Sequence, residues 1–90
     1  MKGDQLTWHW DVPDSHPYAR GIRRGWDAGF SGADRPKKAD SDAELDAYEA
    51  GVRARRELHD EHRRFGELRV SVTGDGAVAY ELTERRGEPA

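Results

Sequence analysis

YARGIRRGWDAGFSG, residues 18–32, is the stretch of sequence that decides the fold. On a helix with about 100° per residue, positions four apart lie on one side of the axis. One such stripe consists of three glycines, Gly21, Gly25 and Gly29. A second, apolar stripe beside it holds Tyr18, Ile22, Trp26 and Phe30. Because each glycine inside a helix costs roughly 0.5–1 kcal/mol relative to alanine, three in register predict the close approach of another backbone.

This first helix is predicted to run from about Pro17 to Phe30. Asp14 and Ser15 offer capping side chains just before it, and Pro17 suits a first helical turn. Gly32 is the type of residue that ends a helix in the left-handed conformation.

The residues before this helix, QLTWHWDV at 5–12, alternate between apolar and polar side chains. Strict alternation is typical of a half-buried strand. The apolar side holds Leu6, Trp8, Trp10 and Val12. We interpret both of these tryptophans as core residues, although exposed tryptophans also stack on bases in proteins that bind single strands.

A charged loop at residues 31–40 leads to a second predicted helix, which begins with a capping-box pattern at Ser41 and Glu44 and runs to about Phe65. Its apolar positions form two groups: Leu45, Tyr48 and Val52, and, roughly 100° further round the axis, Leu58, His62 and Phe65. We expect the first half to pack on the first helix, near Gly51, and the second half on the sheet.

After Gly66 the apolar period changes to two, and a TGDGA turn divides the alternating stretch. This pattern predicts a β-hairpin whose apolar positions are Leu68, Val70, Val72, Val78, Tyr80 and Leu82. A lone hairpin is marginal in water, so we expect the first strand to join its sheet. The predicted fold is α+β in the order β-α-α-β-β, a helical hairpin packed on a small three-stranded sheet. Residues 1–90 form a single domain, with 83–90 as a frayed tail.

Composition narrows the classes of function. The chain has no cysteine, which excludes disulfides, thiolate zinc sites and cysteine nucleophiles. It has no apolar run long enough to span a bilayer, so we expect a cytoplasmic protein without membrane contacts. A glycine-rich phosphate loop and a nucleophile elbow are also missing, and we therefore expect no enzymatic activity, no catalytic residues and no cofactor.

Histidine is the remaining source of metal ligands. His59 and His62 are three residues apart on a predicted helix, and His9 and His16 lie among acidic residues near the N-terminus. Zinc needs three or four convergent ligands, so these spacings permit a site without specifying one. We predict no metal site and leave open whether His59 and His62 bind a metal ion.

Charge is distributed unevenly along the chain. Residues 18–38 carry six basic side chains, Arg20, Arg23, Arg24, Arg35, Lys37 and Lys38. We predict that they face outward and contact the phosphates of ribosomal RNA or another structured nucleic acid. Residues 40–49 are acidic, with Asp40, Asp42, Glu44, Asp46 and Glu49. As an alternative, this acidic stretch or a free sheet edge binds a host protein complex, as a phage-type inhibitor or adaptor would.

The two predicted helices resemble the ribosome modulation factor family, whose members carry a G-aromatic-x-A-G-x-x-G helix and a second helix with an aromatic-x-x-G element. The corresponding stretches here are GWDAGFSG at 25–32 and YEAG at 48–51, within a resemblance that covers residues 18–55. It implies a non-enzymatic, ribosome-associated protein that contacts ribosomal RNA. RPKK at 35–38 replaces the family's Cys-Pro-Tyr-like element, and the net charge of −3 departs from its basic character. The glycine stripe also permits a homodimer, since a second copy can fill the same groove.

Overall fold

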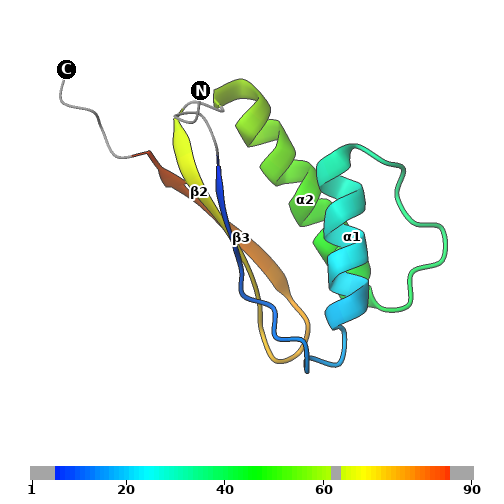
Figure 1. The fold of residues 1–90 in the computed structure, drawn as a ribbon. Helices are drawn as coiled ribbons and strands as arrows, with labels where there is room; N and C mark the ends of the chain where they lie inside the picture. Colours follow the sequence, from blue (N-terminus) through cyan, green and yellow to red (C-terminus); the bar gives the residue numbers. More distant parts are fainter. Residues whose placement is uncertain (1–5, 62–63, 86–90) are drawn as a thin grey trace, which may run out of the picture.

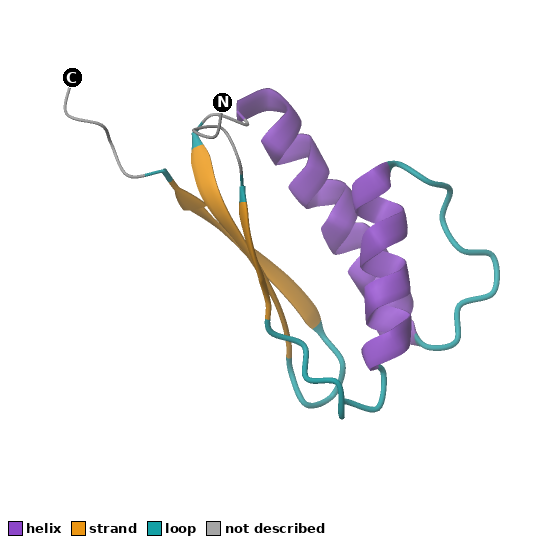
Figure 2. Cartoon of the chain, in the orientation of Figure 1, coloured by secondary structure: helices purple, strands orange, loops and turns teal. Residues whose placement is uncertain are grey.

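The computed structural model describes residues 6–61 and 64–85. Its elements follow in the order β1 (Thr7–Trp10), α1 (Ala19–Ser31), α2 (Asp42–Glu61), β2 (Phe65–Val72) and β3 (Val78–Glu84) (Figure 1). The two helices form a hairpin that covers one side of a three-stranded sheet (Figure 2). The predicted α+β fold is confirmed.

β2 is the central strand of a mixed sheet with the order β1-β2-β3. β2 and β3 pair antiparallel as the predicted hairpin, and the turn between them closes with a hydrogen bond from the Thr73 N–H to the Ala77 carbonyl at 2.9 Å. β1 pairs parallel to β2, with Thr7 opposite Glu67 and Trp10 opposite Val70. A parallel neighbour needs a long crossover connection, and here both helices supply it. β1 and β3 are therefore the two edges of the sheet.

The helices cross where the glycines of α1 meet the backbone of α2. A Cβ atom on Gly29 would lie 3.0 Å from the carbonyl carbon of Tyr48, and one on Gly51 would lie 2.8 Å from the carbonyl oxygen of Trp26. These contacts confirm the predicted close approach and the position of Gly51 at the crossing. Because α2 fills this groove, the glycine stripe is not open to a second copy of the chain.

The core lies between the helices and the sheet. α1 contributes Ile22 and Trp26, and β2 contributes Leu68 and Val70; all four are at most 1% exposed. α2 contributes mainly small side chains: Ala43, Ala47, Ala50, Ala54 and Leu58. The predicted apolar group at Leu45, Tyr48 and Val52 is only half-buried. Small residues line the buried side of α2 because a close helix crossing leaves little room for larger ones.

Two predicted helix boundaries are wrong. α2 ends at Glu61, and Phe65 begins β2, where it is buried as a strand residue. His62, assigned to the same helix face, lies outside the described residues. α1 begins at Ala19 without a side-chain cap from Asp14 or Ser15.

A backbone turn starts α1 instead. The Ala19 N–H donates to the His16 carbonyl at 3.0 Å, and the Tyr18 N–H donates to His16 Nδ1 at 3.1 Å. At the other end, Gly32 has a φ of 84° and ends α1 in the left-handed conformation, as predicted.

The C-terminal strand is longer than expected. β3 continues to Glu84, so Thr83 and Glu84 belong to the sheet and not to a frayed tail. Glu84 also accepts hydrogen bonds from the Arg64 guanidinium across the end of the hairpin. The rest of the predicted tail, residues 86–90, lies outside the described residues.

Candidate functional site

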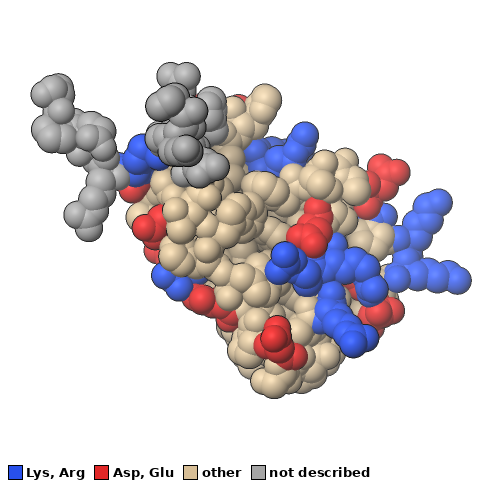
Figure 3. Space-filling view, in the orientation of Figure 1, with Lys and Arg blue, Asp and Glu red and all other residues tan. Residues whose placement is uncertain are grey.

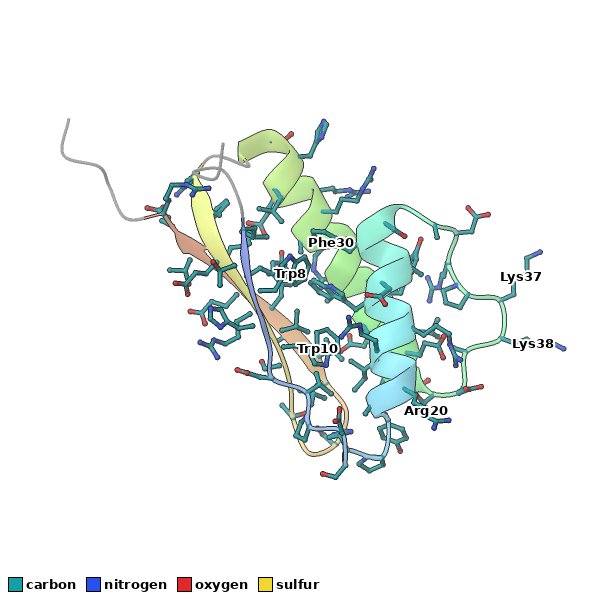
Figure 4. All side chains as sticks on the ribbon, viewed as in Figure 1. Trp8, Trp10, Arg20, Phe30, Lys37 and Lys38 are labelled. Carbon is teal, nitrogen blue, oxygen red and sulfur yellow. The ribbon has the colours of Figure 1, made fainter. Side chains whose placement is uncertain are left out.

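Basic side chains gather over α1 and the loop that follows it (Figure 3). We call this the basic surface; it consists of the six residues that the sequence singled out, Arg20, Arg23, Arg24, Arg35, Lys37 and Lys38. All six are exposed. Lys37 and Lys38 extend outward from the loop, and Arg20 lies near the start of α1 (Figure 4). The structure thus brings the six cations to one side of the molecule, but it gives them different surroundings.

Arg24 is bound within the molecule. Its guanidinium donates to both carboxylate oxygens of Glu44, from Nε at 2.9 Å and from Nη2 at 3.0 Å, and Nη2 also donates to Asp40 at 2.6 Å. Glu44 is 1% exposed, whereas the Arg24 side chain is 57% exposed. A buried carboxylate requires such partners, because burial without them disfavours its charged form. Arg24 therefore holds α1 against α2.

The sequence places Glu44 there through the helix start that it helps to form. The Glu44 N–H donates to Ser41 Oγ at 3.4 Å, and the Glu44 carboxylate accepts the Asp40 N–H at 3.0 Å. This is the predicted capping arrangement, with the carboxylate reaching one residue beyond Ser41. The hydrogen bonds from Arg24 are the largest influence on the pKa of the Glu44 carboxyl and hold it below its ordinary value, although burial acts the other way.

Arg23 and Arg35 make weaker, exposed ion pairs. Arg23 Nε lies 3.3 Å from an Asp27 oxygen one helical turn away, and Arg35 Nη1 lies 3.4 Å from a Glu49 oxygen. Exposed pairs of this kind contribute about 0–1 kcal/mol. A phosphate can therefore displace either carboxylate at little cost.

The remaining three members of the basic surface are Arg20, Lys37 and Lys38. Within residues 6–61 and 64–85, no ion pair or hydrogen bond engages their side chains, and we call them the free cations.

Most side chains of the acidic stretch, residues 40–49, make contacts within the chain. Asp40 and Glu44 bind Arg24, Glu49 pairs with Arg35, and Asp46 accepts the Val78 N–H at 2.6 Å. The last of these bonds ties α2 to the beginning of β3. Among the five acidic residues of the stretch, only Asp42 has no such partner in the described part of the chain. Four of the five carboxylates therefore make contacts within the chain, and Glu44 is the buried one among them.

The histidines do not converge. His9 Nε2 lies 3.3 Å from a Glu67 oxygen on the neighbouring strand, and His16 Nε2 lies 3.1 Å from the Thr73 carbonyl oxygen at the hairpin turn. The described residues contain no group of three or more His, Asp or Glu placed to hold a metal ion. The hypothesis that pairs His59 with His62 falls partly outside them.

A groove between β1 and α1, which the sequence analysis missed, lies beside the basic surface. Its walls are aromatic, and we call it the aromatic groove: Trp8, Trp10, Trp26 and Phe30 line it, together with Arg23, Asp27 and Ser31. Its volume is about 480 Å³. Trp8 is 45% exposed, so its interpretation as a core residue is wrong; Trp10 is half-buried. The sequence feature that could have indicated this groove is the pair of tryptophans, Trp8 and Trp10, on a strand that forms an edge of the sheet.

Comparison with protein-family models, with curated proteins and with solved structures found no significant match. None of the described helices combines the length and the apolar character that crossing a membrane requires.

Proposed function

We propose that this chain is a small, non-enzymatic binding protein that docks on structured RNA, with ribosomal RNA the first candidate, through its basic surface. The observation that carries the proposal is the presence of Arg20, Lys37 and Lys38 as free cations on one exposed side. Exposed cationic side chains are among the groups that contact phosphates in protein–nucleic acid complexes. The resemblance of the helical hairpin to the ribosome modulation factor family points in the same direction.

The contacts around the six cations give them different roles in the proposed binding. Arg20, Lys37 and Lys38 bind phosphate without breaking any contact, and Arg23 and Arg35 join them by releasing exposed carboxylates. Arg24 stays bound to Glu44 and holds α1, which carries Arg20 and Arg23, against α2. Up to five phosphate contacts are therefore within reach of this surface.

Counterion release gives this binding mode a measurable signature. The logarithm of the affinity falls with the logarithm of the salt concentration, with a slope of about −0.9 per phosphate contact on a duplex. For three to five contacts, raising the salt from about 50 to about 200 mM weakens binding roughly 40- to 500-fold.

The test is co-sedimentation of the purified protein with ribosomes at these two salt concentrations. We expect association at low salt that is lost at high salt and weakened by Lys37→Glu. The matched control is Arg56→Glu, which makes the same charge change at an exposed position about 21 Å along α2 from its start. Absence of sedimentation at low salt, or equal loss with both variants, contradicts the proposal.

A further inference from the structure

The backbone of β1 is hydrogen-bonded on one side only. The Asp11 N–H donates to the Val70 carbonyl at 2.8 Å, so the residues at 9 and 11 direct their backbone groups toward β2. Successive residues of a strand direct these groups to opposite sides, and therefore Trp8 and Trp10 direct theirs toward the free edge. Outside the sheet ladders, the hydrogen bonds of the described residues include none to these groups. The edge is thus open to pairing with another strand.

The free edge does not face open solvent alone, because α1 lies alongside it. The Trp8 ring stands edge-on to Phe30, with ring centroids 5.0 Å apart, and the Arg23 guanidinium lies 4.8 Å from the centre of the Trp10 ring. Trp8, Trp10 and Phe30 meet in the space between β1 and α1 (Figure 4). The aromatic groove therefore has a strand edge along one wall and a helix along the other.

A molecule that binds in this groove has to form hydrogen bonds with the free backbone groups of β1 and also cover the apolar side chains of the walls. A strand added beside β1 would run about 4.8 Å from it, which is the normal spacing in a sheet. Its alternate side chains would point to the same side as the rings of Trp8 and Trp10, toward α1. Those positions favour apolar residues, since they cover Trp8 and fill the cavity beside Phe30.

The charges along the groove favour a peptide over a nucleic acid. Arg20 and Arg23 line the groove and its continuation past Trp10, but Asp14 and Asp27 line the same walls. The two positive and two negative charges balance, so the groove offers no net attraction to a chain of phosphates. Nor can a nucleic acid backbone match the alternating N–H and C=O groups of a strand edge.

We propose that the aromatic groove binds an extended peptide, with apolar side chains at alternate positions, which pairs with β1 as an additional strand of the sheet. Strand addition at an exposed edge is a recurring mode of peptide recognition, in which main-chain bonds give affinity and pockets for alternate side chains give specificity. This site and its continuation share Arg23 and Arg20 with the basic surface but not Lys37 or Lys38, and the proposal does not depend on RNA binding.

The probe is a pool of seven-residue peptides that alternate serine with valine, leucine or phenylalanine. Amide hydrogen exchange of the protein is measured with and without these peptides. Binding is expected to slow the exchange of the Trp8 and Trp10 amides at least tenfold and to leave the already bonded Asp11 amide unchanged. N-methylation of the alternate peptide amides that face β1 is expected to abolish binding, whereas methylation of the other set is tolerated. If both sets of methylated peptides bind equally, strand addition is wrong.

A matched pair of variants tests the groove itself. Trp8→Ala is expected to weaken peptide binding at least tenfold, and Tyr18→Ala, at another aromatic that is 42% exposed but outside the groove, to leave it unchanged. Lys37→Glu is expected to leave peptide binding unchanged while it weakens RNA binding, so the failure of one proposal can be distinguished from the failure of the other. If a seven-residue oligouridylate shifts the Trp8 and Trp10 resonances and the peptides do not, the groove is a base-stacking site and the proposal is overturned.

Discussion

The backbone of Gly25 lies directly against the carbonyl group of Glu44. A Cβ atom on Gly25 would stand 3.0 Å from the Glu44 carbonyl carbon and closer still to its oxygen. The carboxylate of the same Glu44 receives the guanidinium of Arg24, the residue that precedes Gly25. One residue of α2 therefore fixes both the distance and the orientation of α1, and through them the direction in which Arg20 and Arg23 of the basic surface face.

Gly25→Ala is expected to destabilise the fold by about 1–3 kcal/mol, because the added methyl group overlaps a backbone that cannot move without opening the helix crossing. Gly21→Ala is the matched control, since its Cβ atom would lie at an ordinary 3.5 Å from the Glu44 side chain. That change should stabilise the fold by about 0.5–1 kcal/mol, the usual preference of a helix for alanine. Urea unfolding measures both, and equal effects at the two glycines would contradict the crossing geometry.

Stability is expected to fall as the pH is lowered below the ordinary carboxyl pKa of 4.5. The pKa of Glu44 is lower than this in the folded protein, so the unfolded chain binds more protons across the window and acid favours unfolding. In Glu44→Gln this part of the pH dependence is lost, which should flatten the curve of unfolding free energy below about pH 5. Asp42→Asn, at an exposed carboxyl, is the control, and a curve for Glu44→Gln as steep as the wild type would refute the assignment.

Asp46→Ala is expected to destabilise the fold by about 1–3 kcal/mol, because the buried end of β3 loses the acceptor of its Val78 N–H. Asp46→Asn keeps an acceptor oxygen at the same position and should recover most of the loss. Thermal unfolding of the two variants provides the comparison. An asparagine variant as unstable as the alanine variant would show that the charge, and not the hydrogen bond, matters.

Arg24→Ala and Arg20→Ala are expected to separate stability from RNA binding. Arg24→Ala leaves the Glu44 carboxylate buried without its main partner and should lower the melting temperature clearly. Arg20→Ala removes a free cation and should leave the melting temperature unchanged while it weakens RNA binding. Differential scanning calorimetry and filter binding on the same samples test the pair; the reverse pattern would exchange the roles of the two arginines.

Local patterns in the sequence were sufficient for most of the fold. The alternation that predicts β2 and β3 involves residues close together in the chain. The glycines of α1 lie on one face of a single helix, so their spacing is also a local pattern. The parallel pairing of β1 with β2 has no such local signal, because Thr7 meets Glu67 only after both helices have intervened. The buried side of α2 was missed because its alanines are weak markers in a pattern that gives weight to large apolar side chains.

The candidate site was predictable as a set of charges and not as a set of contacts. A count of charges along the chain cannot distinguish Arg24, whose partner Glu44 lies twenty residues away, from Arg20, which has none in the described part of the chain. Two sequence patterns, the glycine stripe and the capping pattern at Ser41, did indicate where the two helices meet. Together they place the start of α2 against the middle of α1, where an arginine meets a capping carboxylate.

The most direct test of RNA docking through the basic surface is the salt dependence of binding to purified ribosomal RNA, measured for the wild type and for Arg20→Gln/Lys37→Gln/Lys38→Gln. The proposal predicts that the triple variant binds more weakly at low salt and that its slope, on logarithmic axes, is shallower by about three, one for each lost phosphate contact. A wild-type affinity that does not change with salt, or a triple variant with the wild-type slope, would contradict it.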